Sequence, residues 1–576
     1  MTKKNSNNFW DGADAKDSRA TSKTASTAPG QKGDENSRVV VRNKLNFDWR
    51  IILGIGAVIL LIVVAILINL NHSHNGDNAS NIAGSIDIDN GDAKINWNRY
   101  ESYNVDLSSI TSGENYTIKS SGVYYLSGSL SDGAIIIQTT SDGVVKLILD
   151  NVSIKNSRGP GIACLSGDDL VIELVGTNKI EDGSSYSSEF DEDVDGAIYS
   201  KADLSFSGDG TLELVANYQD GIVGKDDVKF NSGTYNITSV DDGIRGKDSV
   251  YIVAGNFEIN AGADAIKSTN ETDTTKGFIL IEKGEFDIVA GAKGIKAINS
   301  ILIYGGNFDI NSSDDAIHSN NYVGVTGGNI EIASSDDGIH ADARLIIDGG
   351  KIDIAKSYEG LEAQKISING GDISIVSNDD GINAGGGADA SATNRVGAGA
   401  FDADENCEIA INGGNVYVNA AGDGIDSNGW TYFNGGTVVV DGPTNNGNGA
   451  LDSGLGISIN GGSVITLGAS GMAESLGSSS SVYNVSVYFT STLEKGTKVE
   501  IRNSAGEILL SHTSAKSFSH LAAGTTAFKY GETYDIFIND EKYQSFTISE
   551  ITTTVGNSNN NFQNMNQGTQ RGQTRQ

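Results

Sequence analysis

The chain of 576 residues contains little proline, cysteine or methionine: three, two and three residues respectively. A strand paired on both sides has no place for a residue that lacks an N–H, so scarce proline fits extended pairing over most of the chain. Two cysteines exclude a disulfide-rich scaffold. Cys164 and Cys407 lie far apart in the sequence, so we expect two small buried thiols and no disulfide between them.

Basic residues are also scarce: 40 Lys and Arg stand against 74 Asp and Glu, which gives a net charge of −34. This charge excludes binding to nucleic acid or anionic lipid by simple attraction. It favours divalent cations, which take hard oxygen ligands. The simplest interpretation of most of the charge is the solubility of an extracellular protein.

Glycine is abundant, with 73 residues, and much of it marks a repeat of about 22 residues, a period typical of stacked supersecondary units. One marker is an acidic residue, then Gly or Ala, then Ile or Leu. It recurs at Asp315-Ala316-Ile317, Asp337-Gly338-Ile339, Glu359-Gly360-Leu361 and Asp380-Gly381-Ile382. The other marker is a Gly-Gly pair with the same step, at Gly305-Gly306, Gly327-Gly328, Gly349-Gly350 and Gly370-Gly371.

Within one repeat the apolar residues alternate at period two, as in Leu345 and Ile347 or Ile352 and Ile354. This spacing predicts three short strands per repeat, and no helical spacing is sustained. We expect Gly-Gly and Asp-Gly to supply positive φ at the corners between strands. The predicted fold is all-β: a right-handed parallel β-helix with aliphatic and aromatic side chains stacked inside.

Two steps of the repeat are stretched. A polar insert, Ser268 to Lys276, lies between Asp264 and Lys293. The gap between Asp380 and Asp423 fits either one extra coil or a loop such as 385–399. Loops of this kind on solenoids often border the binding face.

Residues 51–70 form a predominantly apolar stretch of twenty residues that contains no charged side chain. A helix of this length can span a bilayer. Four basic residues precede them, Arg38, Arg42, Lys44 and Arg50, which places the N-terminal side in the cytoplasm. We expect an uncleaved, single-pass anchor in the cell membrane with the remainder outside; cleavage near Ala79 is the alternative.

Beyond the repeats, residues 483–552 alternate cleanly but lack both markers. We interpret them as a small antiparallel β-domain, a sandwich that caps the open end of the solenoid. The predicted organisation is a disordered cytoplasmic tail (1–50), a transmembrane helix (51–70), a linker (71–96), the parallel β-helix (97–482), the C-terminal β-domain (483–552) and an Asn/Gln-rich disordered tail (553–576).

Equivalent positions in successive coils form columns about one strand spacing apart. The acidic corner is the first column, and like charges on adjacent strands repel. Asp residues are favoured in turns for their own side-chain bonds, but the whole column also suits Ca²⁺ between carboxylates. The candidate calcium ligands are Asp241, Asp242, Asp314, Asp315, Asp336, Asp337, Asp379 and Asp380.

The second column follows the corner Ile and changes from cations through histidines to anions. One interpretation is a solvated strand face that points outward. The other is a groove in which successive cations meet the negative groups of an extended chain, with the histidines bonding sugar hydroxyls or holding a metal. The candidate carbohydrate-binding residues are Arg245, Lys267, Lys296, His318 and His340.

Catalysis would need more than these columns supply. A lyase needs calcium carboxylates and a base, for which Arg245 or Lys267 are candidates. A hydrolase needs a defined carboxylate pair, and the repeat offers too many to choose from. No position breaks the repeat to assemble a distinct mixed constellation, which favours binding over catalysis.

Several segments together resemble a known family over roughly residues 98–549. They are Gly122–Gly128, Gly176–Gly183, Ala197–Leu204, Asp220–Asp227, Asp242–Lys247, Phe518–Leu521 and Gly531–Tyr534. They look like the bacterial carbohydrate-binding β-helix family related to polysaccharide lyases, with a pectate-lyase-like solenoid. The resemblance implies a secreted or surface-attached protein, acidic polysaccharides such as polygalacturonate, bound calcium and no established catalysis. Lys293 and Glu359 depart from the corner Asp, so no calcium site is expected across the Lys293 coil.

The leading hypothesis is therefore a membrane-anchored extracellular module that binds an acidic polysaccharide along the solenoid. The alternatives are a calcium-dependent polysaccharide lyase and a structural or adhesive stalk. Trp430 and Tyr432 are candidate aromatic platforms for sugars near the C-terminal coils.

Overall fold

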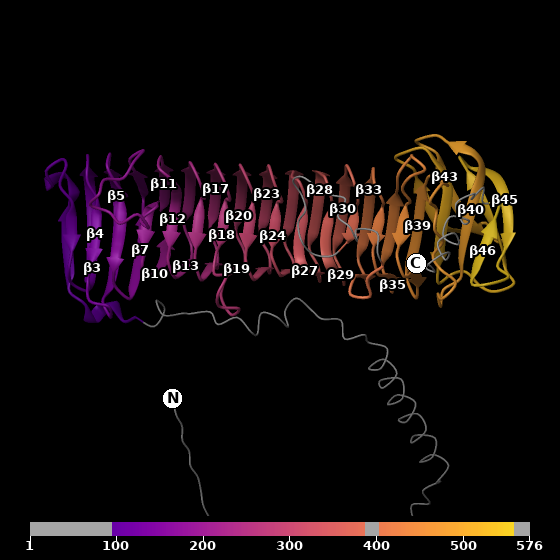
Figure 1. Ribbon diagram of the computed structural model, residues 1–576, viewed down its shortest axis with the longest axis horizontal. Coiled ribbons are helices and arrows are strands. Elements are labelled where there is room, and N and C mark those ends of the chain that lie inside the picture. Colours follow the sequence, from indigo (N-terminus) through magenta and orange to yellow (C-terminus); the bar gives the residue numbers. More distant parts are fainter. Residues whose placement is uncertain (1–94, 386–402, 558–576) are drawn as a thin grey trace, which may run out of the picture. The chain divides into compact units, whose positions relative to one another are not determined.

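The computed structural model describes residues 95–385 and 403–557, all of them in the compact unit Asn75–Gln576. Strands wind into a parallel β-solenoid of about 15 turns with about 23 residues in each (Figure 1). This confirms the predicted all-β solenoid. Within the described ranges no helix is long and apolar enough to cross a membrane. The predicted tail 1–50 and transmembrane helix 51–70 lie outside these ranges.

Each coil contributes a strand to each of three faces, in the order face 1, face 2 and face 3. Face 1 contains β2 (Tyr116–Ile118), β4 (Ile135–Gln138), β6 (Ile162–Ser166), β9 (Gly196–Ser200), β12 (Asp220–Gly224), β15 (Ile244–Gly246), β18 (Ile266–Ser268), β21 (Ile295–Ala297), β24 (Ile317–Ser319), the start of β27 (Ile339–Ile347) and of β29 (Leu361–Ile368), β31 (Ile382–Ala384), β34 (Ile425–Ser427) and β37 (Leu451–Ser453).

Face 2 continues from face 1 within each coil, and in β27 and β29 one strand serves both faces. It contains β1 (Ser102–Asp106), β3 (Gly122–Leu130), β5 (Val144–Lys155), β7 (Asp169–Val175), β10 (Asp203–Gly208), β13 (Asp227–Phe230), β16 (Ser249–Ile252), β19 (Phe278–Ile281), β22 (Ser300–Ile303), β25 (Tyr322–Val325), the ends of β27 and β29, β32 (Glu408–Ile411), β35 (Trp430–Phe433) and β38 (Gly456–Ile459). Two short 3₁₀ segments, η1 (Trp97–Arg99) and η2 (Leu107–Ser109), flank β1.

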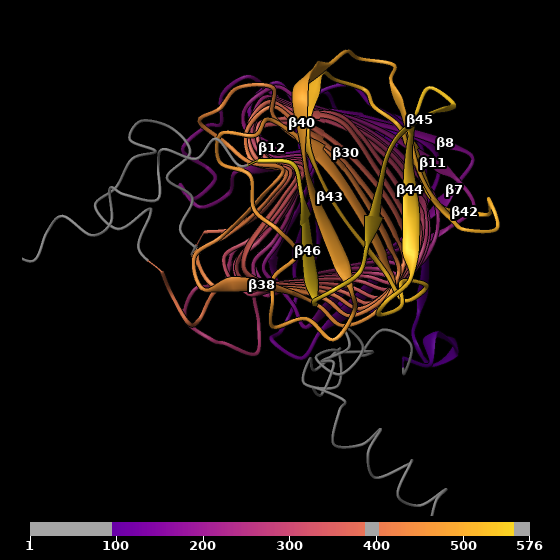
Figure 2. The same cartoon turned by 90° about the vertical axis from the view of Figure 1, so that its right-hand side faces the viewer.

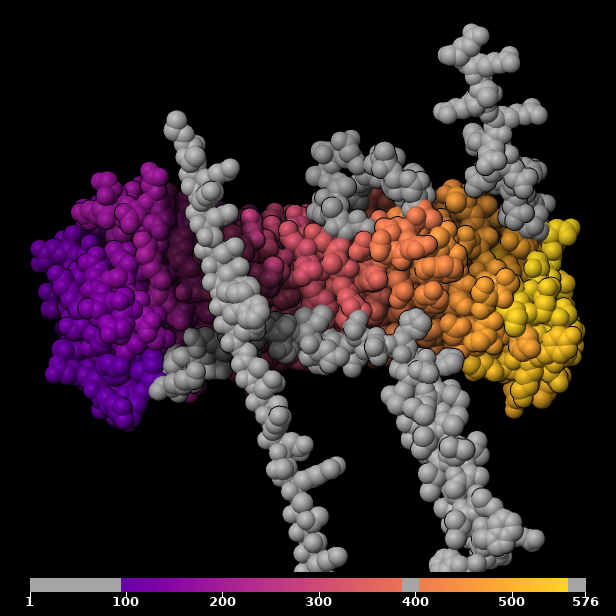
Figure 3. Space-filling view, turned by 60° about the horizontal axis from the view of Figure 1, so that its bottom comes forward, coloured from indigo at the N-terminus to yellow at the C-terminus, as the bar shows by residue number. Residues whose placement is uncertain are grey.

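Face 3 follows the Gly-Gly turn and leads back to the acidic corner. It contains the ends of β3 and β5, then β8 (Thr177–Glu181), β11 (Thr211–Ala216), β14 (Thr234–Ser239), β17 (Asn256–Ala261), β20 (Glu285–Ala290), β23 (Asn307–Ser312), β26 (Asn329–Ser334), β28 (Lys351–Ser357), β30 (Asp372–Ser377), β33 (Asn415–Ala420), β36 (Thr437–Asp441) and β39 (Ser463–Gly468). In Figure 3 the colours succeed one another along the stack, because each coil contacts its neighbours in chain order.

The core consists of the inward-facing positions that the alternation predicts. Leu345, Ile347, Ile352 and Ile354 are all fully buried in it. Aromatic rings also stack from coil to coil; the centroids of Phe286 and Phe308 lie 4.5 Å apart and nearly parallel. Identical positions of successive coils therefore bury apolar area against one another, the main driving force for such a fold.

The Asp-Gly glycines differ from the prediction. Positive φ occurs at the second residue of the Gly-Gly pairs, such as Gly306 and Gly350, but not at corner glycines such as Gly243. A Cβ on Gly243 would lie 2.6 Å from the carbonyl oxygen of Ala265 in the next coil. The corner needs a small residue because two backbones approach closely, and it makes no demand for a left-handed conformation.

The stretched step before Asp423 adds no coil to the stack. Ile382 pairs directly with Ile425, and Lys365 with Glu408, so no coil separates them. Cys164 and Cys407 are buried and unbonded, as expected.

The C-terminal segment caps the solenoid by extending face 3. β43 (Phe518–Thr525) pairs antiparallel with β39, and β40 (Asn484–Leu493) and β46 (Thr552–Val555) follow it. A second sheet, β42 (Ile508–Thr513), β41 (Lys498–Asn503), β44 (Thr533–Ile538) and β45 (Glu541–Thr547), completes the cap (Figure 2). One boundary changes: β46 reaches Val555, so the cap includes the start of the predicted tail.

Candidate functional site

The acidic corner forms a hydrogen-bonded ladder between coils. Asp220 accepts a bond from the backbone N–H of Asp242 at 3.0 Å, and Asp242 accepts one from Asp264 at 3.1 Å. Lys293, Asp337 and Glu359 donate their N–H groups in the same way to the corner before them. The corner carboxylates therefore satisfy backbone donors that the turn leaves unpaired, which is a structural use of the column.

Cations of the second column neutralise the first half of this ladder. Arg245 lies beside Asp220, with Nε to Oδ2 at 2.7 Å, and its Nη2 is 2.5 Å from Asp195. Lys267 contacts Asp242 at 3.1 Å and Asp264 at 2.8 Å. The register places Arg245 opposite Lys267, and Lys267 opposite Lys296. Arg245 and Lys267, for which a solvated face was one of two interpretations, instead lie against the corner carboxylates.

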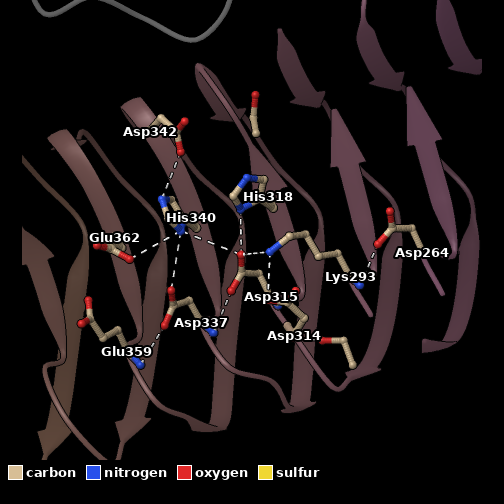
Figure 4. Close-up of polar contacts among 12 residues, drawn as sticks. Asp264, Lys293, Asp314, Asp315, His318, Asp337, His340, Asp342, Glu359 and Glu362 are labelled. Carbon is tan, nitrogen blue, oxygen red and sulfur yellow. Dashed lines mark hydrogen bonds and ion pairs between the residues drawn. The ribbon is translucent and has the colours of Figure 1, made fainter. Parts of the chain in front are cut away.

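The two histidines lie deeper, where the coils of β24 and β27 meet (Figure 4). Nδ1 of His318 is 2.7 Å from Oδ2 of Asp315, and Lys293 Nζ is 2.6 Å from the same oxygen. Burial alone would raise the pKa of Asp315, but His318 and Lys293 hold it below its usual range. The His340 ring is fully buried and meets the His318 ring edge-on, with centroids 4.7 Å apart.

In the later coils, carboxylates accumulate without an ion-pair partner among the residues that the structure describes. Asn383, Asp426 and Asp452 follow one another on face 1 beside the corner residues Asp380 and Asp423. Burial, then repulsion from Asp423 and Asp379, raises the pKa of Asp380 to about 7. Burial and its acidic neighbours raise the pKa of Asp426 to about 8. These groups favour a proton or a metal ion over isolated charges.

The structure brings several predicted calcium ligands together. One oxygen from each of Asp220, Asp241 and Asp242 lies within 4.8 Å of the others, and the same holds for Asp314, Asp315 and Asp336. Lys267 and Lys293 already contact Asp242 and Asp315 in these groups. Asp337, Asp379 and Asp380 lie at the next corners. The calcium assignment stays a prediction.

The predicted carbohydrate-binding residues occupy one continuous column, as the register expected. Their accessibility differs: Lys296 is half-buried, Arg245 and Lys267 are partly buried ion-pair partners, and His318 and His340 are buried. Their role in sugar binding stays a prediction.

A second row of polar side chains, which sequence reasoning missed, lies on the outside of face 2. Tyr322, Arg344, Lys365, Glu408 and Trp430 occupy consecutive coils in register. A groove of about 400 Å³ opens beside the first three and is lined by Thr274, Thr275, Lys276, Phe278, Asn299, Ser300, Asn321, Tyr322, Ala343, Arg344, Gln364 and Lys365. Reading the first residue of each face 2 strand as a column would have revealed this row.

The aromatic residues predicted as sugar platforms continue the same face. The rings of Trp430 and Tyr432 are nearly parallel with centroids 6.2 Å apart, and Trp430 is 37% exposed. The next coil has Gly456 opposite Trp430, so no side chain at that position covers the indole. Cations, amides and aromatic rings thus share one face.

Comparison with known proteins gives three matches. Residues 112–381 match the family model described as "Carbohydrate-binding domain-containing protein". A protein of that description from Acetivibrio thermocellus is 33% identical over 139 residues, which is 23% of this chain and 48% of the relative. The chain thus spans about half the length of that relative.

A solved structure, titled "Structure of the polysaccharide lyase-like protein from C. thermocellum, Gadolinium derivative", is 24% identical. The match covers 47% of this chain and 92% of that chain, with a TM-score of 0.32. Residues 112–381 of this chain are thus similar to the carbohydrate-binding domain family, and the match covers just under half of the chain.

Proposed function

We propose that this protein binds an acidic polysaccharide along face 2, with the chain of sugars parallel to the stack of coils. The observation that carries the proposal is the row on consecutive coils, with Arg344 and Lys365 in the groove and Trp430 beyond Glu408. The similarity of residues 112–381 to the carbohydrate-binding domain family supports the ligand class.

The spacing of the row suits a polymer. Successive coils are separated by one strand spacing, about 4.8 Å, so six coil steps from Phe278 to Trp430 extend over about 29 Å. Arg344 and Lys365 would contact carboxylates of the sugar, while Asn299, Asn321 and Gln364 offer amides for hydroxyls. Trp430 would stack on the apolar face of a ring.

Calcium belongs to the same proposal as a counterion of the acidic corner. The protein is strongly acidic, so a polyanion approaches it against long-range repulsion away from the groove. Ca²⁺ bound at the corner carboxylates would lower the net negative charge of the protein and weaken that repulsion. Anchoring through residues 51–70, with the solenoid outside the cell, completes the proposal.

The test is a pull-down of the chain with insoluble polygalacturonate, with and without calcium, while absorbance of unsaturated products is followed. We expect binding without absorbance. The double variant R344Q/K365Q should weaken binding by roughly 100- to 10,000-fold, because two charge-assisted bonds are lost and each contributes about 1.5–3 kcal/mol. A matched variant, K179Q, removes an exposed cation from face 3 and should bind like the parent.

Each other outcome has a distinct meaning. Absorbance at the wavelength of unsaturated uronates would support the lyase alternative. The absence of both binding and absorbance would support the alternative of a structural or adhesive stalk. Equal losses in R344Q/K365Q and K179Q would show that binding depends on charge in general and not on face 2.

A further inference from the structure

His340 is a buried side chain whose polar atoms lack hydrogen bonds. Its ring is fully buried, and neither Nδ1 nor Nε2 has a hydrogen-bond partner of acceptable geometry. Yet Nδ1 faces three carboxylates: Glu362 at 3.4 Å, Asp337 at 3.6 Å and Asp315 at 3.8 Å (Figure 4). Unsatisfied buried nitrogens are costly, so this arrangement needs an explanation.

The separations match the edges of a metal coordination shell. Ligand bonds of about 2.0–2.1 Å in a tetrahedral zinc-type site place neighbouring ligand atoms about 3.4 Å apart. The ligand atoms of Asp337, His340 and Glu362 lie within 4.8 Å of one another, and these residues come from consecutive coils. Hydrogen-bonded groups would lie closer, as His318 and Asp315 do at 2.7 Å.

The other ring nitrogen faces a carboxylate, the kind of group toward which a metal-bound histidine usually directs its second nitrogen. Nε2 lies 3.4 Å from Oδ1 of Asp342, which is on the same strand, β27. A metal-ligating histidine typically directs its second nitrogen to a carboxylate, which fixes the tautomer and orients the ring. Asp342 and Glu362 are 28% and 16% exposed, so an ion reaches the cluster from their side.

We propose that His340 Nδ1, Asp337 and Glu362 bind a divalent transition metal of the Zn²⁺ class, with Asp315 at the fourth side and Asp342 orienting the ring. An imidazole among carboxylates selects such ions over Ca²⁺, which needs six to eight oxygen ligands at longer distances. The ion would balance the carboxylates of three coils, of which Asp315 already contacts Lys293 and His318. It would also join these coils in the middle of the solenoid.

A proton is the competing occupant. In that case His340 is an imidazolium, a cation that needs no metal, because its carboxylate neighbours outweigh burial and raise its pKa to about 11. The two states differ at Nδ1, which carries a hydrogen in the imidazolium and carries none when it binds a metal. The experiment must therefore report on this nitrogen as well as on metal content.

The test uses the full-length chain after its metals have been removed with a chelator. One sample is titrated with Zn²⁺ and a separate sample with Co²⁺. We expect one equivalent to bind, a visible Co²⁺ absorption band, a higher unfolding temperature and no displacement by calcium in excess. The variant H340Q should abolish binding. D342N should weaken it by about 10- to 100-fold, as loss of an orienting carboxylate does.

The control is H512Q, which removes a histidine from the cap and should leave the metal stoichiometry unchanged. Because H340Q places a different polar group in the core, nitrogen NMR of the parent protein's imidazoles gives a second readout. Failure to bind Zn²⁺ and Co²⁺ together with hydrogen on both nitrogens of His340 overturns the proposal. Binding that H340Q and H512Q reduce equally also overturns it.

Discussion

At the scale of single residues, the acidic corner shows how carboxylates at the same position of successive coils are stabilised. Each carboxylate accepts a backbone N–H of the next coil, and in the early coils one cation serves two or three of them. Burial would raise the pKa of Asp220, and the Arg245 guanidinium limits that rise to about 6. Replacing the Arg245 guanidinium by an uncharged group therefore leaves more than one buried carboxylate without a counterion.

The first prediction concerns Arg245. The variant R245M should lower the free energy of unfolding by about 3–5 kcal/mol, because removing one partner leaves buried carboxylates uncompensated. Chemical denaturation checks this. The control K155M breaks an exposed pair with Glu181 and should cost under about 1 kcal/mol. Equal effects in the two variants would show that the Arg245 network contributes no more than a surface pair.

At the scale of elements, the face 1 strands change character along the stack. β15 and β18 carry Arg245 and Lys267, whereas β34 and β37 carry Asp426 and Asp452 at the same position. The later strands bring no positive charge to a column that already holds Asp380 and Asp423 at its corner. Protonation is therefore favoured in the coils of β31, β34 and β37, where burial raises the pKa of Asp380 and Asp426.

The second prediction is a pH dependence of stability in chelator. The pKa values of Asp380 and Asp426 are raised to about 7 and about 8, so the folded state binds more protons than the unfolded state. Stability must then fall as pH rises from about 4, the unfolded carboxyl pKa, to about 8. Thermal unfolding at several pH values measures this.

The matched variant for that experiment is D426N, which stays neutral at every pH and should flatten the decline. Millimolar calcium should flatten it as well if an ion binds these carboxylates. An unfolding temperature that rises between about pH 5 and about pH 8 in chelator would contradict the predicted direction.

At the scale of the whole described unit, the cap protects the last edge of the solenoid. β39 would end face 3 with unpaired N–H and C=O groups, and β43 covers it. An uncovered edge of this length is a template for aggregation. Asp441, at the end of β36, joins the two parts: it accepts bonds from His512 at 2.9 Å, Ser514 at 3.2 Å and Tyr417 at 3.0 Å.

The third prediction concerns this junction. D441N should destabilise the cap by about 1.5–3 kcal/mol, the contribution of a buried charge-assisted bond, and increase amide exchange in β42 and β43. The pKa of Asp441 is lowered because its hydrogen bonds to His512 and Ala515 outweigh burial, so this stabilisation is lost as pH falls toward that pKa. Unchanged exchange in D441N would contradict the assigned role.

Much of the architecture could be predicted because the same residue pattern recurs at a fixed step along the chain. Period-two alternation in residues such as Leu345 and Ile347 identified the inward positions, and the 22-residue step placed Arg245, Lys267 and His318 in one column, as the register has them. The sequence left open whether an extra coil or a loop fills the step between Asp380 and Asp423. The two differ only in strand pairing, which the sequence does not give.

The site was less predictable, because a column specifies neighbours but not their accessibility. Outward alternation suggested that His340 is solvated, but its ring is fully buried by the corner and the adjacent coils. The row through Arg344 and Lys365 carries no repeated motif, so it emerged only when face 2 was assembled.

The sequence by itself determined the parallel solenoid, the inward-facing core and the two columns, since those follow from local periodicity and identical steps. Only the tertiary structure decided which charges neutralise one another, which face carries the groove, and how His340 is enclosed. The physical reason is that solvation and pairing depend on distances across coils, where side chains of different length bend toward or away from the corner. The sequence lists these side chains in order but does not give those distances.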